Sequence, residues 1–158
     1  KKVTSGKEMF DAVKRTLPTD IAVCSAAVSD FKPLTKKKQK IKKKLKLDEI
    51  KLEYNPDILE FLGKNNRYKP KLLVGFSSET ENIISNSMEK MQNKFCDIMV
   101  ANDVSKKGIG FNSDFNEVII IDKKGNTEKI KKNSKRFIAS ILARKIMNSF
   151  LDIKKNLN

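Results

Sequence analysis

The chain has 158 residues, of which 39% are hydrophobic, and carries a formal net charge of +15. This length suffices for one domain with a substantial core, and no apolar run reaches the roughly 18 residues of a membrane helix, so we expect a cytoplasmic protein without a transmembrane segment. Histidine is absent, which excludes imidazole zinc sites and histidine-dependent nucleophilic catalysis.

The positive charge comes almost entirely from lysine. Only Arg15, Arg67, Arg136 and Arg144 are arginines, whereas lysine, asparagine and isoleucine are all abundant, as in proteins of AT-rich genomes. Because readers of duplex DNA favour arginine for bidentate contacts with guanine, base-specific recognition is weakly supported. The net charge of +15 nevertheless keeps a basic module associated with nucleic acid as an alternative function. Neither cysteine belongs to a CxxC motif, and we expect both to be small buried hydrophobes.

The N-terminal third of the sequence predicts a helix, a strand and a loop. Ser5 and Glu8 have the spacing of a capping box, and the helix they begin extends to about residue 17. Residues 21–28 form an uncharged apolar run typical of a strand covered on both faces. Residues 32–48 are lysine-rich without apolar periodicity, which predicts a loop.

The next elements alternate between strand and helix. Residues 50–54 alternate apolar and polar side chains, which indicates an exposed strand. A helix is expected over residues 55–64, with Asn55 as its cap and Pro56 in its first turn. Residues 71–79 predict a second buried strand.

An amphipathic helix and a third buried strand follow. The helix is expected over residues 81–95, with Ile84, Met88 and Met91 on its apolar face. The strand is expected over residues 96–103 and breaks at its polar end into a glycine-containing loop.

The C-terminal part predicts a hairpin and a last helix. Residues 117–130 form two strands around a tight turn at residues 124–126. The final helix is capped by Ser134 and extends to about residue 150, and residues 151–158 are expected to be a frayed tail.

This order predicts an α/β fold: a Rossmann-like three-layer α/β/α arrangement with a mainly parallel sheet and an antiparallel hairpin near the C-terminus. In such sheets, ligands bind at the carboxyl ends of the strands. Those ends are residues 26–30, 76–79 and 101–105, each small or polar after an apolar strand. Their convergence favours a crevice for a small molecule over a long basic groove.

Several side chains near these ends have chemistry suited to a ligand. Small residues at Ser25, Ala26 and Ala27 would let a ligand approach the backbone, although tight helix packing explains them equally well. Asp30 could accept a hydrogen bond from a ligand or cap a turn. The helix that begins near Pro56 offers free backbone N–H groups to an anion, although most helix starts bind only water.

Three lysines are candidates for binding phosphate. Lys40 lies in the lysine-rich loop and could close over a phosphate, although a lysine run is more often a solvated surface. Lys90 and Lys94 are four residues apart on one helix face, where two like charges repel each other, which hints at an anionic ligand. A P-loop motif is absent, so any nucleotide is held in another way.

Six motifs resemble, in order and approximate spacing, the phosphopantothenate-cysteine ligase domain of the bacterial CoaBC (Dfp) flavoprotein family. They are "AAVSDFKP", "KIKK", "NPDIL", "VGFSSET", "ANDVS" and "GFNSDFNEV". The resemblance implies that residues 1–150 form a CTP-binding ligase domain and residues 151–158 a tail. It further implies an enzyme of coenzyme A biosynthesis that, with Mg²⁺, uses CTP to activate 4'-phosphopantothenate as an acyl-cytidylate, which L-cysteine then attacks.

The resemblance also implies the residues of the site. Lys40 would close over the reacting phosphates as the catalytic residue, and Lys90 and Lys94 would bind CTP from their helix. The remaining positions implied to contact the nucleotide are Cys24, Ser25, Ala26, Asp30, Pro56, Asp57, Ile58, Leu59 and Phe76.

The family's ligase domain starts with a glycine-rich segment and an "SSGxMG" stretch that this sequence does not contain. Since these parts help to bind phosphopantothenate, we expect the present chain to need them for full activity, and a non-catalytic remnant of the fold is a further alternative. The resemblance implies a homodimer, and it places FMN only in the decarboxylase domain of the full-length protein, which is absent from this sequence.

Overall fold

The computed structural model describes all residues except 36–38, 40–48, 66, 106–112 and 157–158. The chain divides into two compact units, and each is described by itself. The first unit consists of Lys1–Thr16 and Ala27–Ile58, and the second of Leu17–Ala26 and Leu59–Asn158.

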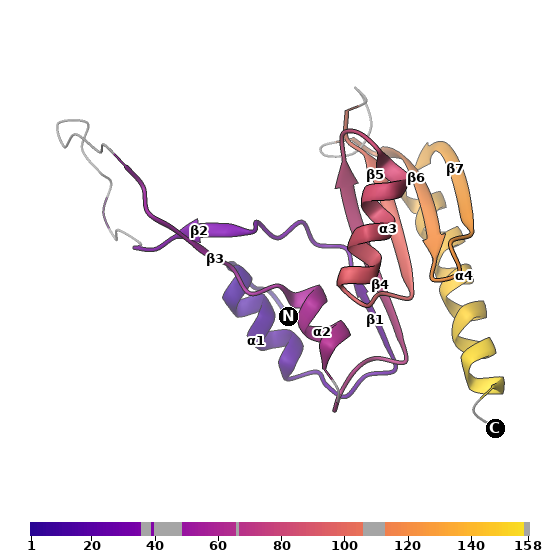
Figure 1. The fold of residues 1–158 in the computed structure, drawn as a ribbon, viewed down its shortest axis with the longest axis horizontal. Coiled ribbons are helices and arrows are strands. Elements are labelled where there is room, and N and C mark those ends of the chain that lie inside the picture. The colour runs from indigo at the N-terminus through magenta and orange to yellow at the C-terminus, as the bar shows by residue number, and fades with distance from the viewer. Residues whose placement is uncertain (36–38, 40–48, 66, 106–112, 157–158) are drawn as a thin grey trace. The chain divides into compact units, whose positions relative to one another are not determined.

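A five-stranded sheet forms the centre of the second unit (Figure 1). Its strands, in spatial order, are β1 (Ile21–Cys24), β4 (Leu72–Glu79), β5 (Ile98–Asp103), β6 (Phe115–Asp122) and β7 (Thr127–Ser134). The first three strands are parallel, whereas β6 runs antiparallel to both β5 and β7. Three parallel strands extended by an antiparallel hairpin confirm the predicted topology.

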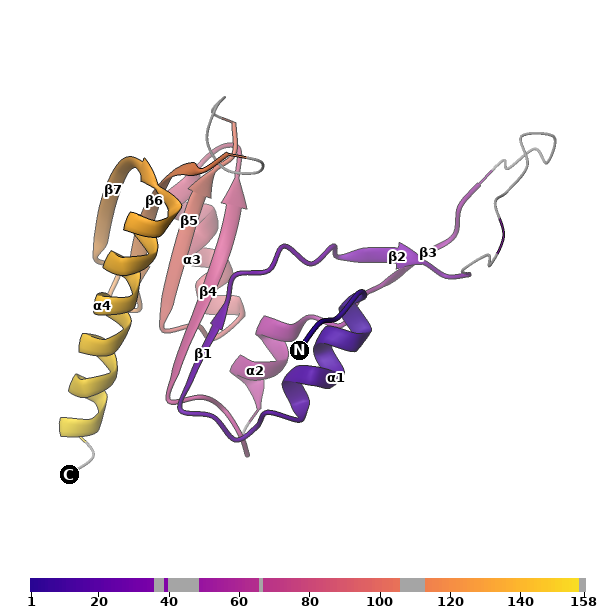
Figure 2. The ribbon, with the colours of Figure 1, turned by 180° about the vertical axis from the view of Figure 1, so that it is seen from behind.

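Helices cover both faces of this sheet. Helix α3 (Ile83–Asn93) lies on one face and α4 (Lys135–Lys155) on the other, as the opposite views in Figures 1 and 2 show. On the α4 side, Leu72, Val74, Ile98 and other buried strand residues pack against the apolar stripe of the helix. This helix–sheet–helix layering confirms the predicted Rossmann-like α/β/α fold.

A short helix, α2 (Ile58–Lys64), packs closely against the end of α3. A Cβ atom added to Gly63 would lie 1.9 Å from the backbone oxygen of Lys94, far inside van der Waals contact. Only a glycine therefore permits this approach, which also buries Leu62 at 1% exposure. The contact fixes α2 on the side of the sheet that α3 covers.

The first unit contains helix α1 (Gly6–Lys14) and a ribbon of two antiparallel strands, β2 (Phe31–Pro33) and β3 (Leu52–Tyr54). Ser5 caps α1 as predicted, because its Oγ accepts a hydrogen bond from Glu8 N at 3.2 Å. The ribbon exposes apolar side chains, and the segment between its strands lies mostly outside the described residues (Figure 2).

Several predicted boundaries were wrong, for identifiable reasons. β1 ends at Cys24 and is not covered on both faces, since it is an edge strand in which Val23 is 46% exposed. Strand β2 was missed, because three residues before a lysine run give no recognisable periodicity. Helix α2 begins at Ile58, and Asn55 instead donates its side-chain amide to the Ser29 carbonyl.

Two further differences concern helices of the second unit. In α3 the buried positions are Ser87 and Met91, whereas Ile84 is 43% exposed. The buried Ser87 hydroxyl bonds to that of Ser77 on β4 at 2.6 Å, so a polar residue occupies an inward position that apolar periodicity cannot reveal. Helix α4 begins after its predicted cap but continues to Lys155, so residues 151–155 are helical.

Across the described ranges, no helix combines the length and the apolar character that crossing a bilayer requires.

Replacing Gly63 with alanine should destabilise the second unit by about 1–3 kcal/mol, because the new methyl group forces α2 away from Lys94. Chemical denaturation followed by circular dichroism measures this change. Asn148→Ala, on the exposed side of α4, serves as a control and should change stability by less than about 0.5 kcal/mol. Equal stability of Gly63→Ala and the wild type would show that the contact with Lys94 is unimportant.

Candidate functional site

The carboxyl ends of three neighbouring parallel strands form one edge of the sheet in the second unit. Cys24, the last residue of β1, is level with Gly75 of β4, and Glu79, the last residue of β4, is level with Asp103 of β5. Parallel pairing therefore points the three carboxyl ends in the same direction, as the sequence predicted, on the side where open α/β sheets bind ligands. The end of β1 is level with Gly75 and so lies four residues before the ends of β4 and β5.

Small, accessible residues continue from β1 at this edge. Cys24 is half-buried and forms no disulfide, while Ser25 and Ala26 are exposed immediately after the strand. Their short side chains leave the backbone open to a ligand. This arrangement fits the predicted nucleotide contacts, although their role stays a prediction.

Phe76 lies on the other side of the sheet from α3. Its half-buried ring packs against the core cluster below α4. Gly75, the residue before it, faces α2, since a Cβ atom there would lie 2.8 Å from Leu59 Cδ2. The Phe76 ring and the Leu59 side chain thus lie on opposite faces of the sheet.

Lys90 and Lys94 do not extend freely into solvent from α3. Lys90 Nζ lies 2.7 Å from Oε1 of Glu79, at the end of β4. Lys94 Nζ lies 3.0 Å from Oε2 of Glu60, in α2. Each lysine is therefore held by a carboxylate from a different element. Lys90 lies in the last turn of α3, and Lys94 is the C-cap residue that follows the helix.

The two carboxylates differ in their surroundings. The Glu79 side chain is only 9% exposed, whereas that of Glu60 is 34% exposed. Hydrogen bonds from Lys64 and Lys94 hold the pKa of Glu60 below its ordinary value. Glu60 thus keeps its negative charge, and its attraction for Lys94, to lower pH than an isolated glutamate would.

The first unit contains four other predicted site residues. Asp30 and the segment before α2 lie side by side, because Asn55 N donates to the Asp30 carbonyl at 2.8 Å. Asp30 and Asp57 are exposed, Pro56 is half-buried, and Ile58 is buried at 9% exposure. The structure therefore brings Asp30 and Pro56 together within this unit, while Ile58 serves packing.

Lys40, the predicted catalytic residue, lies outside the described residues. Among the residues that the structure does describe, no three cysteine or acidic side chains gather into a group able to hold a metal ion.

Sequence reasoning missed both glutamates. Glu79 is the last residue of a strand that begins with an apolar run, and a carboxylate at that position is a recognisable signal. Glu60 stands in the first turn of a short helix, where an acidic residue is ordinary, so nothing in the sequence distinguishes it.

Removing the Lys90 side chain should cost stability as well as charge. Lys90→Ala leaves the buried Glu79 carboxylate without its cation, and we expect a loss of about 1–3 kcal/mol in the free energy of unfolding. The double variant Lys90→Ala/Glu79→Gln should recover most of this lost free energy of unfolding. Chemical denaturation of the wild type and the two variants measures the difference.

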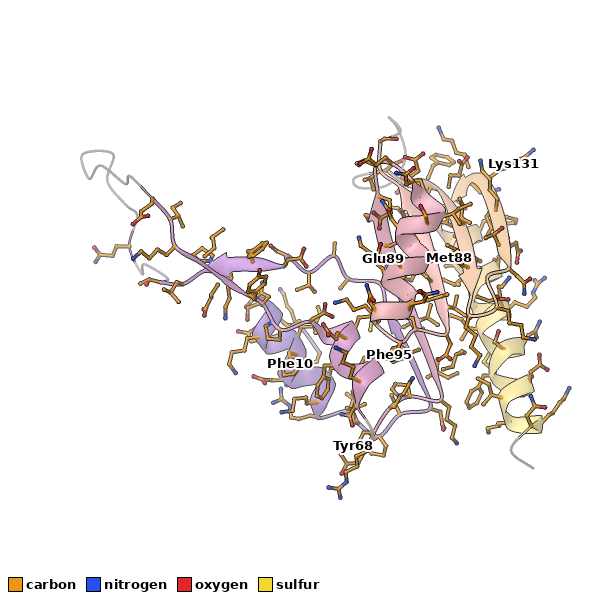
Figure 3. All side chains as sticks on the ribbon, in the orientation of Figure 1. Phe10, Tyr68, Met88, Glu89, Phe95 and Lys131 are labelled. Carbon is orange, nitrogen blue, oxygen red and sulfur yellow. The ribbon has the colours of Figure 1, made fainter. Side chains whose placement is uncertain are left out.

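Lys131→Ala is the control for that experiment, because Lys131 is an exposed lysine on β7 (Figure 3). It should change the free energy of unfolding by less than about 0.5 kcal/mol. A Lys90→Ala protein as stable as Lys131→Ala would contradict the importance of the ion pair.

Comparisons with known proteins agree with this fold. The chain is 39% identical over 146 residues to a protein named cysteine/cysteine sulfinic acid decarboxylase from an unidentified prokaryote. It is 35% identical over 147 residues to the coenzyme A biosynthesis bifunctional protein CoaBC of Vibrio vulnificus strain CMCP6. These matches cover 92% and 91% of the chain, but only 40% and 36% of the relatives.

Two solved structures have the same fold. The crystal structure of the C-terminal domain of CoaBC matches with a TM-score of 0.74 at 26% identity, over 95% of this chain and 65% of that one. The DNA/pantothenate metabolism flavoprotein from Streptococcus pneumoniae matches with a TM-score of 0.69 at 19% identity, over 95% of this chain and 70% of that one.

The family model described as the DNA/pantothenate metabolism flavoprotein C-terminal domain matches residues 1–150. In CoaBC proteins of this family, the C-terminal domain is the ligase of coenzyme A biosynthesis. The chain belongs to the DNA/pantothenate metabolism flavoprotein family, as a relative of the CoaBC C-terminal domain.

Proposed function

We propose that the chain carries out, or forms the nucleotide-binding part of, CTP-dependent ligation of 4'-phosphopantothenate to L-cysteine in the cytoplasm. The single observation that carries the proposal is the carboxyl-end side of β1 and β4. Accessible small residues follow β1, and the ion pair with Glu79 holds the Lys90 ammonium at the end of β4. The phosphates of a nucleotide need such a cation, and small residues would let its base and ribose approach the backbone.

In the proposed reaction, the pantothenate carboxylate attacks the α-phosphorus of CTP and displaces pyrophosphate. The amine of L-cysteine then attacks the acyl carbon, so that the amide forms and CMP leaves. Lysine ammonium groups stabilise the negative charge that builds up on the phosphates. We assign this role to Lys90, Lys94 and Lys40, and proximity to the base and ribose to Ser25 and Ala26.

The other predicted contacts keep the same assignment. Asp30 and Asp57 are exposed in the first unit, and Pro56 follows Asn55, whose backbone N–H donates to the Asp30 carbonyl. Within the second unit, Leu59, Phe76 and Cys24 would shape the site by packing.

We propose Mg²⁺ as a companion of the triphosphate. Mg²⁺ ordinarily binds through one or two carboxylates together with substrate phosphates, and it would neutralise part of their charge. We assign it no residue and propose no flavin for this chain, since the family resemblance places FMN in the separate decarboxylase domain.

Calorimetric titration with CTP and then ATP, in Mg²⁺ at moderate salt, tests nucleotide binding. We expect CTP to bind at least about tenfold more tightly than ATP, because a base-reading site rejects the wrong base. Weak binding of both nucleotides that falls steeply with salt would instead favour the nucleic-acid alternative. Binding of neither would indicate a non-catalytic remnant.

We further propose that the chain forms a homodimer through the β2–β3 ribbon. Leu52 and Tyr54 are 58% and 77% exposed, and Tyr54 stacks with Phe31 at a ring-centroid distance of 4.8 Å. An isolated two-stranded ribbon is at best marginally stable, and its free edges can pair with another strand. A second copy would cover the apolar side chains and extend the ribbon.

Leu52→Lys should therefore convert the dimer to a monomer in light scattering. Met147→Lys, which makes the same change at a 50% exposed position on α4, is the matched control and should leave the dimer intact. Dissociation by Met147→Lys but not by Leu52→Lys would move the interface to α4 and contradict this assignment.

A further inference from the structure

The two ion pairs on α3 share an unusual arrangement. Lys90 and Lys94 lie one helical turn apart, and each contacts a glutamate from another part of the second unit. Glu79 comes from the end of β4 and Glu60 from α2. The two lysines therefore do not repel each other as strongly as their spacing alone implies, because two carboxylates balance their charge.

Glu79 is the less ordinary of the two partners. Its side chain is 9% exposed, and no donor in the described part of the chain makes a well-directed hydrogen bond to its solvent-inaccessible Oε1. The Lys90 ammonium, 2.7 Å away, compensates this charge. A glutamate is rarely retained in such a place without a partner, since burying an uncompensated carboxylate is costly.

The unequal burial decides which group positions the other. Glu79 is fixed at the end of β4, an interior strand of the sheet, whereas the Lys90 side chain is 52% exposed. A half-exposed lysine has four rotatable bonds and would otherwise sample many conformations. Contact with a fixed carboxylate selects those in which Nζ lies at the carboxyl end of β4.

We propose that Glu79 is a positioning residue, which holds Lys90 ready for the phosphates of the nucleotide. This inference rests on the proposed function. An ammonium group has three N–H donors, so Lys90 can keep its contact with Glu79 and still donate to a phosphate oxygen. Glu79 lowers the local positive charge, but it spares the ligand the cost of ordering a long side chain.

Glu79→Gln tests the proposal, because glutamine keeps the shape of the side chain and loses its charge. Glu89→Gln is the matched control, since Glu89 is an exposed glutamate on α3 next to Lys90 (Figure 3). Titrations of wild type and both variants use three probes: CTP, inorganic tripolyphosphate and cytidine. Thermal unfolding of each protein shows whether it is folded.

We expect Glu79→Gln to bind CTP and tripolyphosphate about tenfold more weakly than wild type, with cytidine affinity changed less than about twofold. Glu89→Gln should match wild type for all three probes. The comparison with cytidine separates positioning from a purely structural role, since a distorted site would weaken binding of cytidine as well.

The outcomes separate this inference from the proposed function. If wild type binds CTP and Glu79→Gln binds it equally well or more tightly, the positioning role is overturned while the function stands. If wild type instead binds tripolyphosphate as tightly as CTP, while Glu79→Gln weakens the binding of tripolyphosphate, the positioning role stands and the proposed function falls. Binding of neither CTP nor tripolyphosphate to wild type overturns both.

Discussion

Parallel pairing of β4 with both of its neighbours is the constraint on which the candidate site depends. Residues Leu72–Val74 are at most 1% exposed, so β4 is buried on both faces and occupies an interior position between β1 and β5. Burying these side chains contributes roughly 1.5–3 kcal/mol each, which makes another register costly. Once β1 and β5 pair in parallel with β4, all three carboxyl ends point to the same side of the sheet, with the end of β1 level with Gly75 and the end of β5 level with Glu79.

Packing of the helices then determines where the charged side chains lie, and it brings Lys90 to the end of β4. Helix α3 returns from the end of β4, and the close approach at Gly63 lets α2 pack beside the C-terminal end of α3. Glu60 and Glu79 consequently reach the two lysines from separate elements. Apolar packing and electrostatic organisation are therefore coupled, because the same helix packing that completes the core determines where the ammonium groups lie.

Sequence reasoning succeeded where local signals agree with tertiary packing. Residues 71–79 and the hairpin around residue 125 were predictable, because long apolar runs and a glycine turn leave few alternatives. β1 was overextended, since an apolar run does not reveal that the strand lies at a sheet edge. Ser87 was missed as a buried position because its hydrogen bond to Ser77 makes a polar residue acceptable there. In the site, topology predicted the direction of the strand ends, and the four-residue spacing of Lys90 and Lys94 suggested a phosphate-binding role that stays a prediction. The glutamate partners depend on contacts between elements that no local pattern encodes.

The most direct test of the central claim is a map of backbone amide shifts in ¹H–¹⁵N spectra during titration with CTP and Mg²⁺. If the carboxyl edge of β1, β4 and β5 holds the nucleotide, the largest shifts in the second unit will fall on Ser25, Ala26, Ser78 and Glu79, with further shifts near Lys90. Small shifts spread over the exposed lysines of β7 and α4, with the strand ends unchanged, would contradict the claim.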